Sequence, residues 1–481
     1  MKFNALLILT LSTLLGCNQQ NNNEVGYAYF GGEIINPNND YIVLTGPDEI
    51  SDTLYLDENN RFLKKIENLK PHIYTFVHGG EYQRVLVESG DSIMLRLNTL
   101  DFDESLVFTG NGARKNNYLI SAFLDNETDN KKFMRMMWDM EPTAFEKALD
   151  SNRSERLADL KDFLQDNDYS DYFKTVAETN ITYDYYFNKE MYPFGYFGYN
   201  NLIHFKDLPE NFYDYRKDAD YNNEELLGVI PYTRFLFWHF NNLALKKYYK
   251  TATHNVVFDK KSVSYNLEKL KLMDSLISNK TVKNHLLRLT TRDFISTSED
   301  SLETQEVVTS FLNKTTKEDD KTYIKDYVEI INQLRVGKTI PNIELLNFNQ
   351  EKVNLHSAID KPTVIYFWSS NLPMLLRNNH SKANSLQSKF PEIDFIAVNI
   401  NDDDMTRWKK TIQQYNFNNS NEYRFVNPNE ATQLLALNSI NKSIFVDGNG
   451  KIINSNVMMI TSEFEDELQR TVSRTKKEAL K

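Results

Sequence analysis

The residues that could do chemistry are few, and the only cysteine limits what the chain can catalyse. Cys17 is the single cysteine in 481 residues, and a disulfide needs two thiols. The eight histidines are scattered, and no HxxxH pair that could hold zinc on one helix face occurs. No GxSxG, P-loop or GxGxxG motif occurs either. We therefore expect no cofactor and no metal site.

The first 17 residues have the pattern of a secretory leader. Lys2 supplies one positive charge, and an apolar run of about 11 residues follows, which is too short to span a bilayer as a stable helix. The run ends at Gly16 and Cys17, and residues 18–24 are a polar tract of asparagine and glutamine that ends in Glu24. This tract has no apolar side chains to bury, so we expect a flexible tether.

The order Leu14-Leu15-Gly16-Cys17 resembles the lipobox of bacterial lipoproteins. The resemblance implies that residues 1–17 contain the signal, that cleavage occurs before Cys17 and that this cysteine carries lipid. More than one acyl chain is needed for stable anchoring. The alternative is an ordinary signal peptide with an incidental cysteine. If Cys17 carries lipid, the mature chain has no thiol left that could form a disulfide or act as a nucleophile.

Charge and the leader together predict where the protein works. A formal net charge of −12 argues against nucleic acid as a partner. We expect a body in water, held to a membrane through Cys17, with an envelope protein or peptide as partner. The outer membrane, facing the periplasm, is the expected location, because Asn18 is not the aspartate associated with inner-membrane retention.

The pattern along the chain predicts a multidomain α+β protein. Short strand-like runs broken by turns, such as 36–40 and 57–60, predict an antiparallel β-sandwich over residues 25–111. Apolar residues at helical spacing predict a helical domain over 112–335. Within it, the aromatic-rich segment 183–199 is either a platform for a glycan or peptide, or ordinary helix packing.

Residues 336–475 have the pattern of an α/β domain. Continuous apolar runs predict buried strands at 363–368, 395–400 and 443–446, with helical stretches after the first two. The turn Asp447-Gly448-Asn449-Gly450 predicts a closing hairpin.

Four segments in order, "RVGKTIPNIEL", "KPTVIYFWSS", "FIAVNINDDDMTRWKKTI" and "SIFVDGNGKII", resemble the TlpA-like and AhpC/TSA-like branch of the thioredoxin superfamily. The resemblance implies a C-terminal α/β thioredoxin-like fold. Earlier stretches such as "LYLDENNRF" and "VLVESGDSIMLRL" resemble the β domain that precedes thioredoxin-like domains in Bacteroidetes lipoproteins. That domain has no agreed function.

The resemblance also shows what is missing. The family places a Cys-x-x-Cys pair after its first core strand, where this chain has Leu372 and Leu375, and a cis-proline where it has Asn441. Leucine cannot ionise or exchange a disulfide, and a cis bond without proline costs about 2.5–4 kcal/mol, so we expect a trans peptide. Pro373 should begin a helix and Asn371 could cap it.

We expect a redox-inactive pseudo-enzyme, a lipoprotein with a binding or scaffolding role. The candidate binding surface is the former redox groove, formed by Trp368, Asn371, Leu372, Pro373 and Asn441. Two alternatives stay open: a thiol-disulfide oxidoreductase relative whose partner supplies the thiols, and a lipoprotein that captures a glycan or peptide through its aromatic middle segment.

Overall fold

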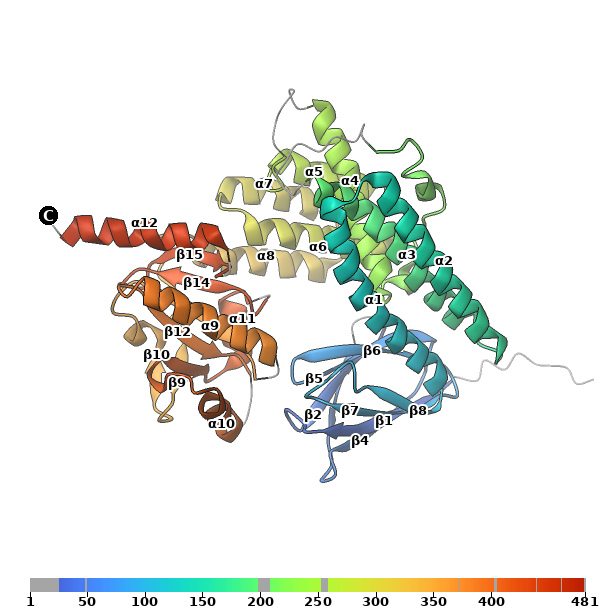
Figure 1. The fold of residues 1–481 in the computed structure, drawn as a ribbon, viewed down its shortest axis with the longest axis horizontal. Coiled ribbons are helices and arrows are strands. Elements are labelled where there is room, and N and C mark those ends of the chain that lie inside the picture. The colour runs from blue at the N-terminus through green and yellow to red at the C-terminus, as the bar shows by residue number, and fades with distance from the viewer. Residues whose placement is uncertain are drawn as a thin grey trace, which may run out of the picture.

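The computed structural model describes residues 26–47, 50–197, 208–251, 258–370, 372–401, 405–437, 439–459 and 461–479. Cys17, the leader, the tether, Asn371 and residues 402–404 lie outside them. Figure 1 shows a mixed α and β chain in three lobes, which we call the sandwich, the helical region and the C-terminal region. Among the described residues, no helix combines the length and apolar character needed to cross a membrane.

The sandwich consists of two four-stranded sheets, with the orders β4-β1-β7-β8 and β3-β2-β5-β6. Its core is filled by alternate side chains of both sheets, including Phe30, Phe76 and Leu95. Its strands are β1 (Ala28–Ile35), β2 (Tyr41–Thr45), β3 (Ser51–Tyr55), β4 (Arg61–Ile66), β5 (His72–His78), β6 (Glu81–Val87), β7 (Ser92–Asn98) and β8 (Val107–Asn111).

The expectation of purely antiparallel pairing is wrong at one position. β1 pairs in parallel with β7, with Tyr29 opposite Ser92, and antiparallel with β4 on its other side. A parallel pair needs a long connection between its strands. Here that connection contains β2, β3, β5 and β6, which form the second sheet, and β4, which pairs with β1 in the first sheet. Hairpin signals in the sequence report neighbouring strands only, so they cannot reveal this pair.

The helical region packs long helices around an aromatic core (Figure 1). Asn116 joins it to the sandwich, because its amide pairs with both the N–H and the carbonyl of Leu86 at 2.7 and 2.9 Å. The helices are α1 (Ala113–Asp139), α2 (Pro142–Gln165), α3 (Asp171–Tyr196), α4 (Ile230–Thr251), α5 (Val263–Leu276), α6 (Lys280–Thr297), α7 (Ser301–Leu312) and α8 (Glu318–Gln333), with short 3-10 turns at Asp214–Lys217 and Glu224–Leu226.

The C-terminal region is built on one sheet in the order β10-β9-β13-β12-β11-β14-β15. β11, β12 and β13 are parallel, and β14 and β15 form an antiparallel closing hairpin. The elements are β9 (Glu344–Asn347), β10 (Lys352–Asn354), β11 (Thr363–Trp368), α9 (Pro373–Lys389), β12 (Asp394–Asn399), α10 (Met405–Tyr415), β13 (Glu422–Phe425), α11 (Pro428–Leu434), β14 (Ser443–Val446), β15 (Ile452–Val457) and α12 (Ser462–Ala479), with 3-10 turns at Leu355–Ala358 and Asn419–Asn421.

The predicted buried strands of this region are confirmed. β11 and β14 have the predicted bounds, and β12 is displaced by one residue. All six residues of β11 are buried because the sheet is covered on both faces. Val364 and Tyr366 pack under α9, α10 and α12, whereas Ile365 and Phe367 belong to the cluster that continues into the helical region. This alternating α/β order agrees with the α/β pattern predicted for residues 336–475.

Candidate functional site

The two positions that the resemblance assigns to the lost thiols lie at the start of α9. α9 begins at Pro373, as predicted, but its N-cap residue is Leu372 and not Asn371. No side chain caps the helix, and the Leu372 N–H donates to the Ser369 carbonyl at 3.2 Å. Leu375 follows in the first turn. Both side chains are half-buried aliphatic groups at a helix end whose free N–H groups would favour an anion.

The prediction that Trp368 forms part of the binding surface is wrong. Its indole is fully buried in the core of the C-terminal region. The indole N–H donates to one Glu422 oxygen at 3.1 Å, and His380 Nε2 lies 3.0 Å from the other. Burial raises the pKa of Glu422, although its two partners act in the opposite direction. The tryptophan therefore supports the strand beneath the groove and cannot contact a ligand.

Asn441 lies in the turn before β14 and is exposed. No cis peptide bond occurs among the described residues, so the bond before Asn441 is trans. Its N–H is 3.3 Å from Ser439 Oγ. The next residue, Lys442, donates to the carbonyls of Leu435 and Ala436 at 2.8 and 3.2 Å, where a cation suits the end of α11. Burial lowers the pKa of Lys442 to about 8.

A cavity of about 400 Å³ lies where the carboxyl ends of the parallel strands face the sandwich. Open α/β sheets characteristically bind ligands at this edge. Among the predicted surface residues, Leu372 lines this cavity, and Trp368 and Asn441 do not, although Ile440, the neighbour of Asn441, does. Asn371 lies outside the described residues. The C-terminal wall consists of Ser369, Leu372, Ile400, Asn401, Pro428, Asn429, Leu437, Ser439 and Ile440, and the sandwich wall of Asn38, Asn39, Tyr41, Gly79, Gly80 and Glu81.

The sandwich wall was not predicted as part of any site. Residues 36–40 gave only a turn signal, because local sequence does not reveal that residues 38 and 440 line the same cavity. The two lobes interact electrostatically here, because the positive charge of Arg407 in α10 contributes to lowering the pKa of His78 in β5. Figure 1 shows α10 on the side of the C-terminal region that faces the sandwich.

Glu81 is the carboxylate of this cavity. It begins β6 and is half-buried. Burial, followed by the negative charges of Asp103 and Glu104, raises its pKa to about 7. The carboxyl group is therefore partly protonated at neutral pH and can donate as well as accept a hydrogen bond.

Of the predicted aromatic segment 183–199, the described part, residues 183–197, does not form a platform. Tyr183, Tyr186 and Tyr192 are each less than 10% exposed and pack in the core of the helical region. Glu190, which also lies in α3, accepts hydrogen bonds from Arg216 Nε at 2.8 Å and from His239 Nδ1 at 2.7 Å. Burial opposes the charge of Glu190, but the interactions with Arg216 and His239 outweigh this effect and hold the pKa of Glu190 at about 2. These groups stabilise helix packing.

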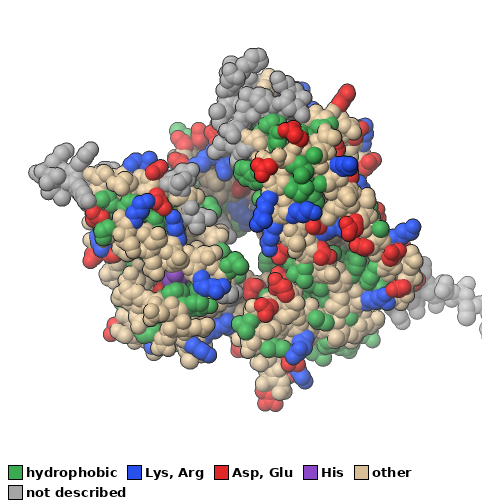
Figure 2. Space-filling view, in the orientation of Figure 1, with side chains coloured by type: hydrophobic (Ala, Val, Ile, Leu, Met, Phe, Trp, Pro, Cys, Tyr) green, Lys and Arg blue, Asp and Glu red, His purple; other side chains and the backbone are tan. Residues whose placement is uncertain are grey.

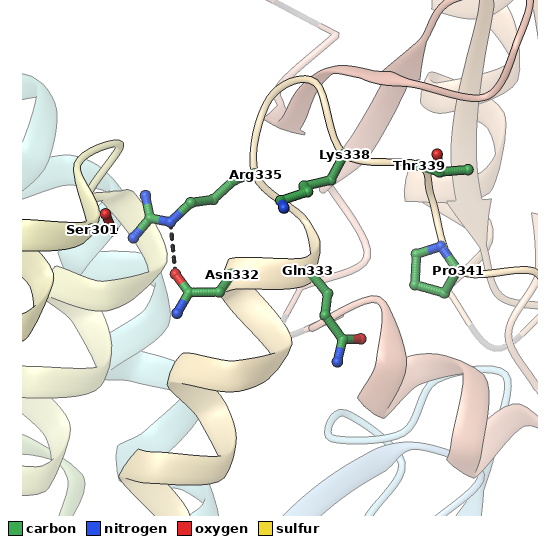
Figure 3. Close-up of a pocket in the computed structure, with 7 residues that line it drawn as sticks. All are labelled: Ser301, Asn332, Gln333, Arg335, Lys338, Thr339 and Pro341. Carbon is green, nitrogen blue, oxygen red and sulfur yellow. Dashed lines mark hydrogen bonds between the residues drawn. The ribbon is translucent and has the colours of Figure 1, made fainter.

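A second hollow of about 600 Å³ lies beside the connection from α8 to β9 (Figure 3). One of its lining residues, Arg335, donates hydrogen bonds to Asn332 Oδ1 at 2.7 Å and to the Glu299 carbonyl at 2.6 Å. The guanidinium thus ties the end of α8 to the α6–α7 turn. Figure 2, which has the orientation of Figure 1, shows an opening between the lobes. We regard this hollow as a junction between lobes.

No protein-family model matches the chain, and no curated protein matches it. Solved structures do. A thioredoxin-like protein from Bacteroides caccae is 12% identical with a TM-score of 0.35, over 59% of this chain and 92% of that one. The thioredoxin domain of a thiol-disulfide oxidoreductase from Bacteroides vulgatus is 19% identical with a TM-score of 0.24, over 30% and 98%.

A thiol:disulfide interchange protein from Bacteroides sp. is 17% identical with a TM-score of 0.26, over 29% of this chain and 92% of that one. Such low identities and TM-scores carry no argument about activity, ligand or partner. The function must therefore be inferred from the residues of this chain.

Proposed function

We propose that this protein is a lipid-anchored envelope protein whose thioredoxin-like region binds a partner and performs no redox chemistry. One observation carries the proposal: the two positions assigned to thiols are Leu372 and Leu375 at the start of α9, and Leu372 lines a cavity. Thiol chemistry needs a thiolate, and Cys17 is the only cysteine. A preserved fold with an aliphatic site is suited to recognition.

The proposed location is the outer membrane, with the body facing the periplasm and Cys17 carrying the lipid. Support comes from the charged start, the short apolar run and the Gly16-Cys17 junction. In the native bacterium, Cys17→Ser should abolish labelling by radioactive palmitate and move the protein from the membrane to the soluble fraction. Labelling that persists in this variant would contradict the anchor.

The redox part of the proposal is tested by insulin reduction and peroxide consumption with the purified mature chain. We expect rates equal to those of buffer with dithiothreitol alone. Turnover above that background would refute it. The oxidoreductase alternative requires a partner's thiols, so the same assays should be repeated with an untreated native envelope extract and with the same extract after treatment with a thiol-blocking reagent.

The binding part is tested by crosslinked pull-down from the native envelope. Leu372→Arg places a charge in the cavity wall, and Met374→Arg is the matched control, because Met374 is 68% exposed on the same helix. We expect a partner that is lost with the first variant and kept with the second. A partner kept with both would move the binding surface elsewhere on the protein.

A further inference from the structure

One face of the sandwich presents apolar side chains to solvent. The sheet β4-β1-β7-β8 turns Phe30, Phe62 and Leu95 into the core. Because side chains alternate along a strand, their neighbours point to the opposite side, and Figure 1 shows this sheet on the side of the sandwich away from the helical region. We call this side the outer face. It consists of three rows of paired residues: Lys65, Tyr29, Ser92 and Asn111; Leu63, Gly31, Met94 and Thr109; and Arg61, Glu33, Arg96 and Val107.

The middle of the outer face is an aliphatic surface. Leu63 and Val107 are 63% and 51% exposed, and Met94 is half-buried beside them. Gly31 lies between Leu63 and Met94 and lets them approach each other, because a Cβ there would be 3.0 Å from both Leu63 Cδ1 and Met94 Sδ. Exposed apolar side chains that gather on one face mark a surface that contacts another molecule or a membrane.

Two tyrosines stand at the end of the outer face where β1 begins. Tyr27 and Tyr29 pack edge to face with their ring centroids 5.9 Å apart, and Lys65 Nζ lies 4.8 Å from the centroid of the Tyr27 ring. Tyr27 is 50% exposed. Tyrosine and lysine beside aliphatic residues suit the boundary between a membrane and water, because their apolar parts contact lipid and their polar ends stay hydrated.

This end of the face is also the end closest to the proposed lipid anchor. Gly26, the first described residue, comes directly before Tyr27 and lies nine residues after Cys17. At about 3.3–3.6 Å per residue, even a fully extended chain of that length reaches only about 30 Å. Acyl chains on Cys17 would therefore keep the tyrosines within that distance of the leaflet. A weak contact with the leaflet then becomes an intramolecular one with a high effective concentration.

The charges on the outer face are mixed, which defines the kind of lipid. Arg61 and Glu33 pair at 3.2 Å. A hollow of about 660 Å³ on this face is lined by Arg61 and Arg96 and also by Glu33 and Asp57. A zwitterionic headgroup carries a phosphate and an ammonium group, so the arginines can meet the first and the carboxylates the second. The net charge of −12 works against attachment to a strongly anionic surface.

We propose that the outer face of the sandwich rests on a leaflet of zwitterionic phospholipid, with Leu63, Met94 and Val107 against the lipid and the tyrosine pair at its boundary. The inference rests on the proposed anchor at Cys17 and adds an orientation to it. The face supplies a second attachment beside the acyl chains, and the helical region projects into water.

The test is hydroxyl-radical footprinting of the lipidated mature chain in vesicles of phosphatidylethanolamine and phosphatidylcholine, read by mass spectrometry. The radicals modify exposed side chains, so contact with the leaflet protects them. Burial of two exposed aliphatic side chains favours the contact by at least about tenfold, and modification of Leu63 and Met94 should slow by about that factor relative to the chain from Asn18 onward without vesicles. Tyr82 and Met374, which are 56% and 68% exposed outside this face, should react equally in both states.

A pair of substitutions tests the contact itself. Leu63→Glu together with Val107→Glu places two carboxylates against the lipid and should restore the modification of Met94, while the chain still floats with the vesicles. Tyr82→Glu is the matched control, because it adds a carboxylate to β6 in the other sheet. Met94 should stay protected in that control. Added phosphatidylglycerol should not increase the protection.

The inference is overturned if the chain floats with the vesicles but Met94 reacts as fast as in solution; the anchor at Cys17 would then stand without the contact. Protection that survives the double substitution, or that requires phosphatidylglycerol, also overturns it. So does protection that appears without vesicles and rises with protein concentration, which would identify a second copy of the chain as the occupant. A chain that does not float would remove the proposed anchor and the inference with it, and flotation separates that failure from loss of the contact alone.

Discussion

Two thiols introduced at the start of α9, by Leu372→Cys together with Leu375→Cys, would test whether these positions correspond to a lost redox pair. Leu372 is the N-cap residue and Leu375 lies three residues later. Side chains three residues apart on a helix have Cβ atoms about 5–6 Å apart, and a disulfide needs about 3.5–4.5 Å. We therefore expect a disulfide to form after a small adjustment of the first turn.

The size of the thiol activation follows from the helix end. A helix N-terminus stabilises a nearby negative charge by about 0.5–1 kcal/mol at a partly exposed site, and one pKa unit corresponds to about 1.4 kcal/mol. From an ordinary value of about 8.5, the pKa of the more exposed thiol should fall to about 8. The half-buried position of Leu372 works against a larger fall.

The assay uses the chain from Asn18 onward, so that the introduced thiols are the only ones. Oxidised glutathione should produce an intramolecular disulfide that mass spectrometry detects, and the pH dependence of iodoacetamide alkylation gives the pKa. The control pairs Leu372→Cys with Met374→Cys, because residues two apart do not face each other on a helix. Equal disulfide formation in the two variants, or none in the first, would refute the correspondence.

Three further changes test the structural account. Glu190→Gln leaves Arg216 and His239 without their carboxylate, so the free energy of unfolding at pH 7, measured in urea, should fall by about 3–5 kcal/mol. Because the pKa of Glu190 is held at about 2, this difference should shrink as the pH falls from about 4.5 towards 2; a difference independent of pH would contradict that pairing. Glu81→Gln should stabilise the chain above pH 7 by about 1 kcal/mol after allowance for solvent screening, and have no effect below about pH 4.5. The reason is that the pKa of Glu81 is raised in the folded chain, so ionisation of its carboxyl group opposes folding as the pH rises. Thermal unfolding across pH 4–8 measures this effect, and a stabilisation confined to low pH would disprove it. Phe145→Ala empties a fully buried ring site and should cost about 3–5 kcal/mol in the same urea titration, whereas a cost below about 1 kcal/mol would show that the aromatic core is not tightly packed.

The sequence predicted best where a local pattern determines structure. The apolar run 363–368 corresponds to β11 with the same bounds, and Pro373 begins α9. The same run misled the site prediction at Trp368, since a strand that is buried on both faces cannot present its last aromatic residue to a ligand. Whether α3 used its tyrosines for packing or for capture depended on burial, which residue type alone does not reveal.

The remaining features depend on contacts between distant residues. The sandwich wall of the cavity is formed by a turn near Asn38 and by Gly79, whereas the opposite wall begins only at Ser369. A turn signal reports a local backbone preference and says nothing about which surface the turn faces.

The parallel pairing of β1 with β7 also has a consequence for biogenesis. β1 can pair with β4 early, but its other edge stays open until β7 has been made, because Tyr29 pairs with Ser92. At a synthesis rate of about 5–20 residues per second, that interval lasts several seconds. An open strand edge is a template for association with other chains. A chain that crosses a membrane before folding would therefore need protection of this strand, and chaperone dependence during export should be concentrated in the first hundred residues.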